Sequence, residues 1–162
     1  MSELQSEIDR HIYVLLTPSG DPQFQYYKAE ALNWLLAHAD AAHPRLMALC
    51  EVDEPPGVVL VTLPRFGRPE SVPVIERALR GAPDPTTVIA AQALAEHPSP
   101  SAREALERAL GDARDQVVAS AADGIAQRGD KASCAALRVA LSHRDHEVCQ
   151  RVREAMEALG CL

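Results

Sequence analysis

The residues best suited to chemistry lie close together near the end of the sequence. His143 and His146 are three residues apart, and Glu147 and Cys149 follow. Imidazole, carboxylate and thiolate groups are the common ligands of transition metals. However, the pattern predicts His143 in a turn and His146 at the start of a helix, so these side chains should not converge on one ion. We interpret the segment as a solvated turn and predict no metal site, no cofactor, no catalytic residue and no enzymatic activity.

The cysteines offer no second site. Cys50, Cys134, Cys149 and Cys161 contain no C-x-x-C pair, so the zinc-knuckle and thioredoxin-like motifs are absent. The first ten residues are polar and acidic and do not resemble a secretory signal. No apolar run approaches the roughly 20 residues of a membrane span. We therefore predict a cytoplasmic protein with reduced thiols, in which Cys134 and Cys149 are small core residues.

The charge balance bears on the type of partner. The chain has 16 basic and 23 acidic side chains and a formal net charge of -7. Such a surface argues against neutralisation of nucleic-acid phosphates and favours a protein partner with a basic or mixed surface. Only two of the basic residues are lysines, and the richness in arginine and alanine suggests a GC-rich bacterial genome.

Four of the six aromatic residues occur within one short stretch. Phe24, Tyr26, Tyr27 and Trp34 lie there together with Glu30. Tyrosine and tryptophan are enriched at the energetic centres of protein interfaces, so the stretch is a candidate contact surface. The alternative is a cap in which bulky residues close the end of the core. In either case we expect Phe24 in the core.

An internal repeat organises the whole chain. Four interlocked series of residues recur at a spacing of 31. They are Leu32, Leu63, Leu94, Ile125 and Met156; Leu79, Leu110 and Leu141; Ile75, Leu106 and Leu137; and Gly67, Pro98, Gly129 and Gly160. The chain also contains 27 alanines, which suit closely packed helices. The repeats predict a single domain with units at about 1–38, 39–67, 68–98, 99–129 and 130–160.

Each unit is predicted to contain two helices joined by a short turn. Apolar residues recur at helical spacing on both sides of a polar turn. The expected helix starts are N-caps at Asp84, Asp115 and Asp145 and Pro-containing starts at Asp21-Pro22, Ser99-Pro100 and His43-Pro44, while Gly129 and Gly160 mark helix ends. In the second unit we expect Met47 and Leu49 to point inward. Residues 57–63, GVVLVTL, have strand propensity, but their place in the repeat predicts a short helix distorted at Pro64.

This pattern resembles the short bacterial form of the HEAT-like repeats, also found in bilin lyases of the phycobilisome type. The resemblance rests on Leu110, Asp115, Val117, Ala121, Ile125 and Gly129, and again on Leu141, Asp145, Val148, Val152, Met156 and Gly160. It implies an all-α, right-handed α-α superhelix of about five helix pairs, in which the second helices line a concave surface. Relatives of this kind include a di-iron hydroxylase and DNA glycosylases. The single His-Glu dipeptide here, and the lack of a basic groove, argue against both activities.

We therefore predict a non-catalytic protein-interaction module or adaptor, monomeric on its own, that binds a partner on the concave face. Helix geometry gives the expected contact residues, and Tyr27 is added because it belongs to the aromatic cluster near Glu30. They are Tyr26, Tyr27, Glu30, Trp34, Val61, Arg65, Gln92, Glu96, Asp123, Gln127, Gln150 and Glu154. Two alternatives remain open: a small acidic inhibitor or immunity-type regulator of one cognate protein, and a bilin-lyase-like factor that loads a cofactor.

Overall fold

The computed structural model describes residues 3–162, and every regular element in that range is a helix. The longer helices follow one another as antiparallel pairs. Their bounds are α1 Glu3–Leu16 and α2 Pro22–Ala37; α3 Ala39–Ala48 and α4 Gly57–Thr62; α5 Val72–Gly81 and α6 Asp84–Glu96; α7 Pro100–Ala109 and α8 Asp115–Arg128; and α9 Cys134–Ala140 and α10 His146–Leu159. Three short 3-10 turns, η1 Leu63–Phe66, η2 Pro69–Ser71 and η3 Lys131–Ser133, complete the fold.

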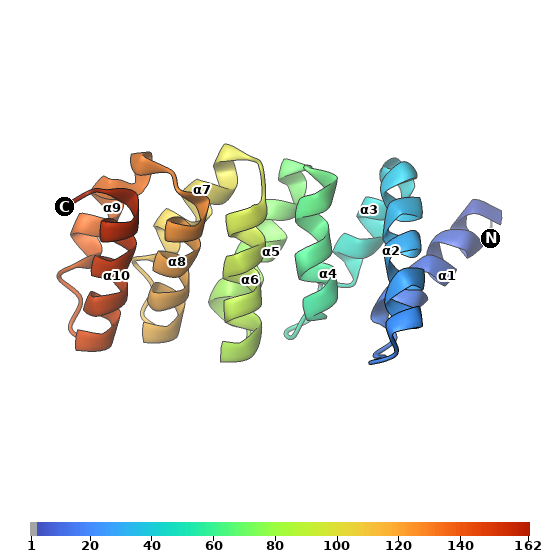
Figure 1. The fold of residues 1–162 in the computed structure, drawn as a ribbon, viewed down its shortest axis with the longest axis horizontal. Coiled ribbons are helices and arrows are strands. Elements are labelled where there is room, and N and C mark those ends of the chain that lie inside the picture. Colours follow the sequence, from blue (N-terminus) through green and yellow to red (C-terminus); the bar gives the residue numbers. More distant parts are fainter. Residues whose placement is uncertain (1–2) are drawn as a thin grey trace.

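The pairs stack into an elongated solenoid of two helical layers (Figure 1). The first helices of the pairs form one layer, and the second helices form the other. In the second layer α6 packs against both α4 and α8, and α8 packs against α10. The all-α solenoid predicted from the repeat is therefore confirmed.

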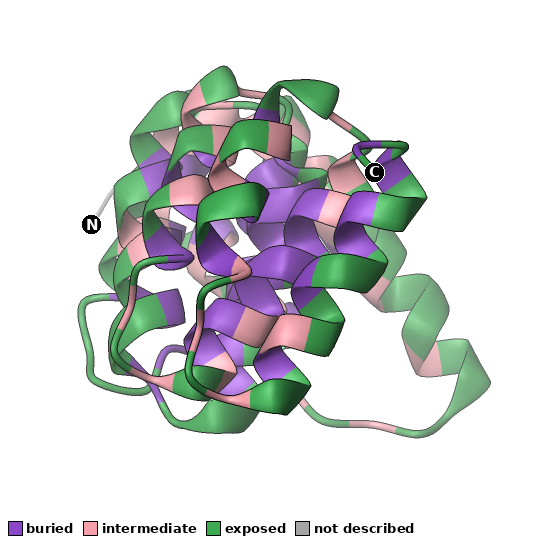
Figure 2. Cartoon of the chain, turned by 90° about the vertical axis from the view of Figure 1, so that its left-hand side faces the viewer, coloured by how far each residue is buried: buried purple, intermediate pink, exposed green. Residues whose placement is uncertain are grey.

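The core lies between the two layers, as the view along the stack shows (Figure 2). The predicted series of large apolar residues lies in it: Leu63, Leu94, Ile125 and Met156 are all buried, at the spacing of 31. Their counterpart in the first unit, Leu32, is only half-buried, and Ala31 and Leu35 are buried in its place. The small side chains between these positions let the helices approach closely.

The helix ends agree with most of the predicted caps. The side chains of Asp21, Ser99 and Asp145 each accept a hydrogen bond from a backbone N–H in the first turn of the following helix. Gly129 and Gly160 end α8 and α10 with φ of 72° and 66°, where a side chain would be strained. The predicted N-caps Asp84 and Asp115 are instead the first helical residues, with Pro83 and Arg114 at the cap positions.

The second unit departs furthest from prediction. Helix α3 begins at Ala39, so Pro44 lies inside the helix and does not start it. With that start Leu46 and Cys50 are buried, while Met47 and Leu49 are only half-buried. The predicted helix at residues 57–63 is present as α4, and it tightens into η1 at Pro64. In the first unit Phe24 is also half-buried rather than a core residue.

Arginines connect neighbouring units along the solenoid. Most of these contacts join residues about one repeat apart. They include Arg45 with Asp9, Arg68 with Asp40, Arg80 with Asp112, Arg108 with Glu76, Arg114 with Asp84 and Arg151 with Asp123. Exposed ion pairs contribute only about 0–1 kcal/mol each. These pairs recur at about the repeat spacing, so similar contacts link successive units along the solenoid.

Helices α6 and α7 both lie close to Gly124 of α8. A methyl group on this glycine would lie 3.1 Å from the carbonyl oxygen of Ala91 in α6 and 3.0 Å from Leu106 Cδ2 in α7. We expect Gly124→Val to lower the free energy of unfolding by about 1–3 kcal/mol, because a backbone carbonyl cannot move aside as a flexible side chain can. Urea unfolding measures this change.

The matched control is Gly81→Ala. An added methyl group at Gly81 would meet no heavy atom within 4 Å, so its effect should stay within about 0.5 kcal/mol. Equal stability of Gly124→Val and the wild type would contradict the close packing described here.

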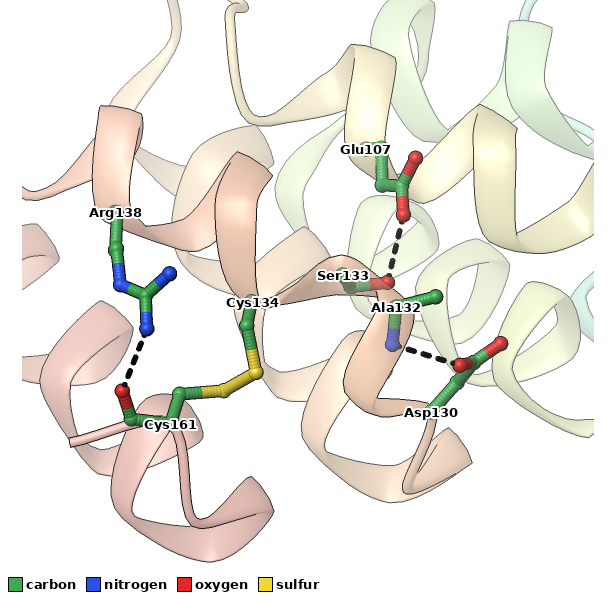
Figure 3. The surroundings of a disulfide bond; sticks show 7 residues. All are labelled: Glu107, Asp130, Ala132, Ser133, Cys134, Arg138 and Cys161. Carbon is green, nitrogen blue, oxygen red and sulfur yellow. Dashed lines mark hydrogen bonds between the residues drawn. A yellow bond between two sulfur atoms is a disulfide. The ribbon is translucent and has the colours of Figure 1, made fainter.

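A disulfide bond closes the last unit. Cys134, the first residue of α9, is bonded to Cys161, which follows the end of α10 (Figure 3). The guanidinium of Arg138 donates a hydrogen bond of 3.0 Å to the carbonyl oxygen of Cys161. The prediction of reduced thiols is therefore wrong for this pair, because the antiparallel helix pair returns the chain to its own start. Cys50 and Cys149 are free.

Candidate functional site

The aromatic residues of α2 are divided between the surface and the interior. Tyr26 and Tyr27 are exposed by 62% and 48%, and their rings meet edge to face at 6.0 Å between centroids. Glu30 lies one turn further along the helix and is also exposed. A hydrogen bond with Glu30 raises the pKa of the Tyr26 hydroxyl. The two tyrosines and Glu30 thus form one accessible group.

Trp34 is half-buried between two histidines. Its ring stacks on His11 of α1 at 4.3 Å and on His38 at 3.9 Å between centroids. His38 Nδ1 also lies 2.8 Å from the backbone oxygen of Trp34. Trp34 and His38 are four residues apart on one helix face, so their contact could be expected from the sequence. The contact of Trp34 with His11 could not, because it depends on how α1 packs against α2. The stack links α1 to α2 and gives Trp34 a structural role.

A small pocket of about 240 Å³ lies between α1 and α2. Phe24, Tyr27 and Ala31 contribute its apolar wall, and Arg10 and Glu30 contribute charged groups. Phe24 therefore lines a surface depression beside the exposed tyrosines instead of filling the core.

The other predicted contact residues lie on α4, η1, α6, α8 and α10, and all of them are exposed. In sequence order they are Val61, Arg65, Gln92, Glu96, Asp123, Gln127, Gln150 and Glu154. Arg151 Nη1 pairs with Asp123 at 2.7 Å across α10 and α8, and Gln150 bonds to Glu154. Because α4, α6, α8 and α10 pack in sequence, the structure brings these residues onto one layer. Helix α2 has little contact with α4, so the aromatic group stands apart from this row.

The segment with possible metal ligands forms a turn with internal contacts. His143 Nδ1 accepts a hydrogen bond from the backbone N–H of Asp145, and His143 Nε2 lies 3.6 Å from an Asp115 oxygen. The Cys149 thiol donates to the carbonyl oxygen of His143 at 3.0 Å, while His146 is exposed at the start of α10. Within residues 3–162 no group of three or more His, Cys, Asp or Glu side chains is arranged to hold a metal ion.

Two histidines, His43 and His97, are buried, and the sequence pattern indicates no such burial. His97 Nε2 lies 3.1 Å from both Ser71 Oγ and the backbone oxygen of Arg68, and its Nδ1 accepts from the N–H of Ser99. His43 is buried beside the ring of Phe66. Burial lowers the pKa of both histidines below the ordinary value of 6.5, and the positive charges of Arg128 near His97 and of Arg68 near His43 act in the same direction.

These histidines predict that acid destabilises the fold. Below pH 6.5 these two histidines bind more protons in the unfolded chain than in the folded protein, so the free energy of unfolding falls as the pH decreases toward their lowered folded pKa values. Above pH 6.5 both histidines are neutral in both states, so they add no pH dependence to the stability. Calorimetry should give a lower Tm at pH 5.5 than at pH 7.5. His97→Gln should reduce this difference, and the exposed His146→Gln should not. An equal or higher Tm at pH 5.5 would contradict the assignment.

No helix in the described part of the chain is long and apolar enough to cross a membrane. The fold defines a class: an α-solenoid made of stacked helix pairs. Residues 86–160 match the family of HEAT repeats. This match and the stacked helix pairs support a HEAT-like repeat protein, as the repeat pattern predicted. Repeats of this family generally mediate protein–protein interactions. No match was found among curated proteins.

Proposed function

We propose that the protein is a non-catalytic interaction module or adaptor that binds a partner protein through the layer of second helices. The observation that carries the proposal is the exposure of Tyr26 and Tyr27, at 62% and 48%, next to Glu30. Exposed tyrosines bury a large area on binding at a low cost in side-chain entropy. The preformed solenoid keeps the ordering cost of association small.

The partner is proposed to have a basic or mixed surface. The row on α6, α8 and α10 exposes the carboxylates of Glu96, Asp123 and Glu154. Arg151 neutralises Asp123 from the neighbouring helix, whereas Glu96 and Glu154 have no ion-pair partner within the described residues. Together with the net charge of -7, these groups favour approach of a positively charged surface.

The test is affinity capture from the native host, with the eluate quantified by mass spectrometry. Tyr26→Ala/Tyr27→Ala should reduce the recovery of a stoichiometric protein partner at least about tenfold, a loss typical of residues at the centre of an interface. Trp34 is left intact because its stack with His11 and His38 supports the fold. The control is Tyr13→Ala, since Tyr13 is 71% exposed but lies on α1. Equal recovery with all three proteins would refute binding through the tyrosines of α2.

The alternatives predict other outcomes of the same capture. A single partner bound tightly at one-to-one stoichiometry, and inhibited by the binding, would identify an inhibitor or immunity-type regulator. A bound chromophore visible by absorbance, with no protein partner, would identify a lyase-like loading factor and overturn the adaptor proposal. We propose a monomer in the absence of the partner, which sedimentation analysis checks.

The cytoplasmic location is also a proposal, and the disulfide weighs against it because structural disulfides are rare in a reducing cytosol. Counting the free thiols of the protein, after host cells are quenched with acid to stop thiol exchange, decides between the cytoplasm and an oxidising compartment. Four free thiols per chain would support the cytoplasm. Two, from Cys50 and Cys149, would place the protein in an oxidising compartment.

A further inference from the structure

In the layer of first helices, the boundary between α7 and α9 differs from the boundary between α5 and α7. Helix α5 packs along α7, whereas α7 and α9 have little contact. Between α7 and α9 lies a groove of about 690 Å³, within the range of about 300–1,000 Å³ that is usual for ligand sites. It is on the opposite layer from the predicted partner face and involves none of its residues (Figure 1).

The groove occurs where the two ion pairs that join α5 to α7 have no counterpart one repeat later. At the α5–α7 boundary Arg108 pairs with Glu76 at 2.7 Å, and Arg80 pairs with Asp112 at 3.0 Å. One repeat later, Val139 stands in the place of Arg108. In the other pair, Gly111 takes the place of Arg80 and His143 that of Asp112. Neither ion pair can therefore form between α7 and α9, and the boundary stays open.

Part of the groove lining is apolar and is contributed by Leu110, Ala113, Ala136, Val139 and Ala140. The rest of the lining is polar or charged. Val139 is 75% exposed, more than any other large apolar side chain in the described part of the chain. Partner segments commonly bury an apolar side chain against an exposed apolar residue that borders a concave surface. Val139 has this position beside the groove.

The charges around the groove leave one cation without a partner. Glu107 is bound by Arg103 at 2.8 Å and by Ser133 Oγ at 2.7 Å, and Asp112 is bound by Arg80. Arg144 also lines the groove, yet it makes no hydrogen bond or ion pair within residues 3–162. Its neighbour Asp145 is occupied as the N-cap of α10. The groove therefore offers apolar lining residues and one free guanidinium, and the guanidinium suits a carboxylate.

We propose that the α7–α9 groove docks a short acidic-apolar segment of a partner protein. One or two large apolar side chains of the segment cover Val139, Ala136 and Ala140, and an Asp or Glu pairs with Arg144. This charge preference is opposite to that proposed for the layer of second helices, so failure of one proposal leaves the other intact.

Selection from a phage-displayed library of random 12-residue peptides tests this inference. On the wild-type protein, enriched peptides should combine large apolar residues with Asp or Glu. Fluorescence polarisation of the synthesised peptides should show at least about tenfold weaker binding to Val139→Asp and to Arg144→Glu. Val88→Asp is the matched control, because it changes an exposed valine on α6 and should leave the affinity unchanged. Selection on Arg144→Glu should instead enrich Lys or Arg in place of the acid.

Three results would overturn the proposal. One is the absence of enriched peptides, and another is equal affinity for wild type, Val139→Asp and Arg144→Glu. The third is sedimentation showing self-association that Val139→Asp abolishes, because a second copy of this chain would then cover the groove.

Discussion

Replacement of Cys134 and Cys161 by serine is expected to lower the free energy of unfolding by about 3–4 kcal/mol. The disulfide joins residues 27 apart in sequence. A cross-link of that span removes loop entropy from the unfolded chain, and the chain-entropy relation gives a stabilisation of this size. The effect should be concentrated in α9 and α10, because in a solenoid each unit contacts only its neighbours.

Urea unfolding with and without a reducing agent measures the effect. The reductant should destabilise the wild type by nearly as much as the double serine substitution does, and it should have no further effect on the substituted protein. Cys149→Ser is the control, since Cys149 is free and should leave the response to reductant unchanged. If the reductant left the free energy of unfolding of the wild type unchanged, the disulfide would not constrain the last unit.

Ile125→Ala is expected to cost about 2–5 kcal/mol, the range measured for truncating a buried Ile, Leu or Met side chain. Ile125 is fully buried in α8, in register with Leu94 of α6 and Met156 of α10. Its removal leaves a cavity in the middle of the three helices that pack most closely in the second layer.

Hydrogen exchange shows both how much stability Ile125→Ala removes and in which helices. Amides of α8 and α10 should lose protection, while those of α1 and α2 should change little, because coupling between distant units is weak. Val139→Ala is the control, since a 75% exposed valine should contribute within about 0.5 kcal/mol. A uniform loss of protection along the chain would contradict the account of the fold as a stack of locally coupled units.

The later repeats were predictable from the sequence because one physical requirement acts at fixed intervals. Each unit must bury the same stripe, so Leu94, Ile125 and Met156 recur at a spacing of 31. Turns with strong local chemistry, such as the Asp145 cap and the Gly160 helix end, were equally predictable. Residues 57–63 show the limit of local propensity. Their composition favours a strand, but packing within the repeat makes them a helix.

The first units and the contacts between units could be predicted less well. Pro44 was assigned to a helix start, but packing keeps it within α3 at the cost of a backbone hydrogen bond. The stack of His11 on Trp34 joins two helices whose relative rotation the sequence does not specify. The groove between α7 and α9 follows from the repeat register only once the ion pairs between α5 and α7 are known, and the sequence does not show which residues pair.

Photo-crosslinking in the native host tests the central proposal most directly. A photoreactive amino acid is placed at Tyr27 or Gln127 on the second helices, or at Tyr13 or Glu104 on the first helices, all of which are exposed. We expect the positions of Tyr27 and Gln127 to give a covalent adduct with the same partner protein, and the positions of Tyr13 and Glu104 to give no adduct with that partner. Adducts from Tyr13 and Glu104, with none from Tyr27 and Gln127, would contradict binding through the second-helix layer.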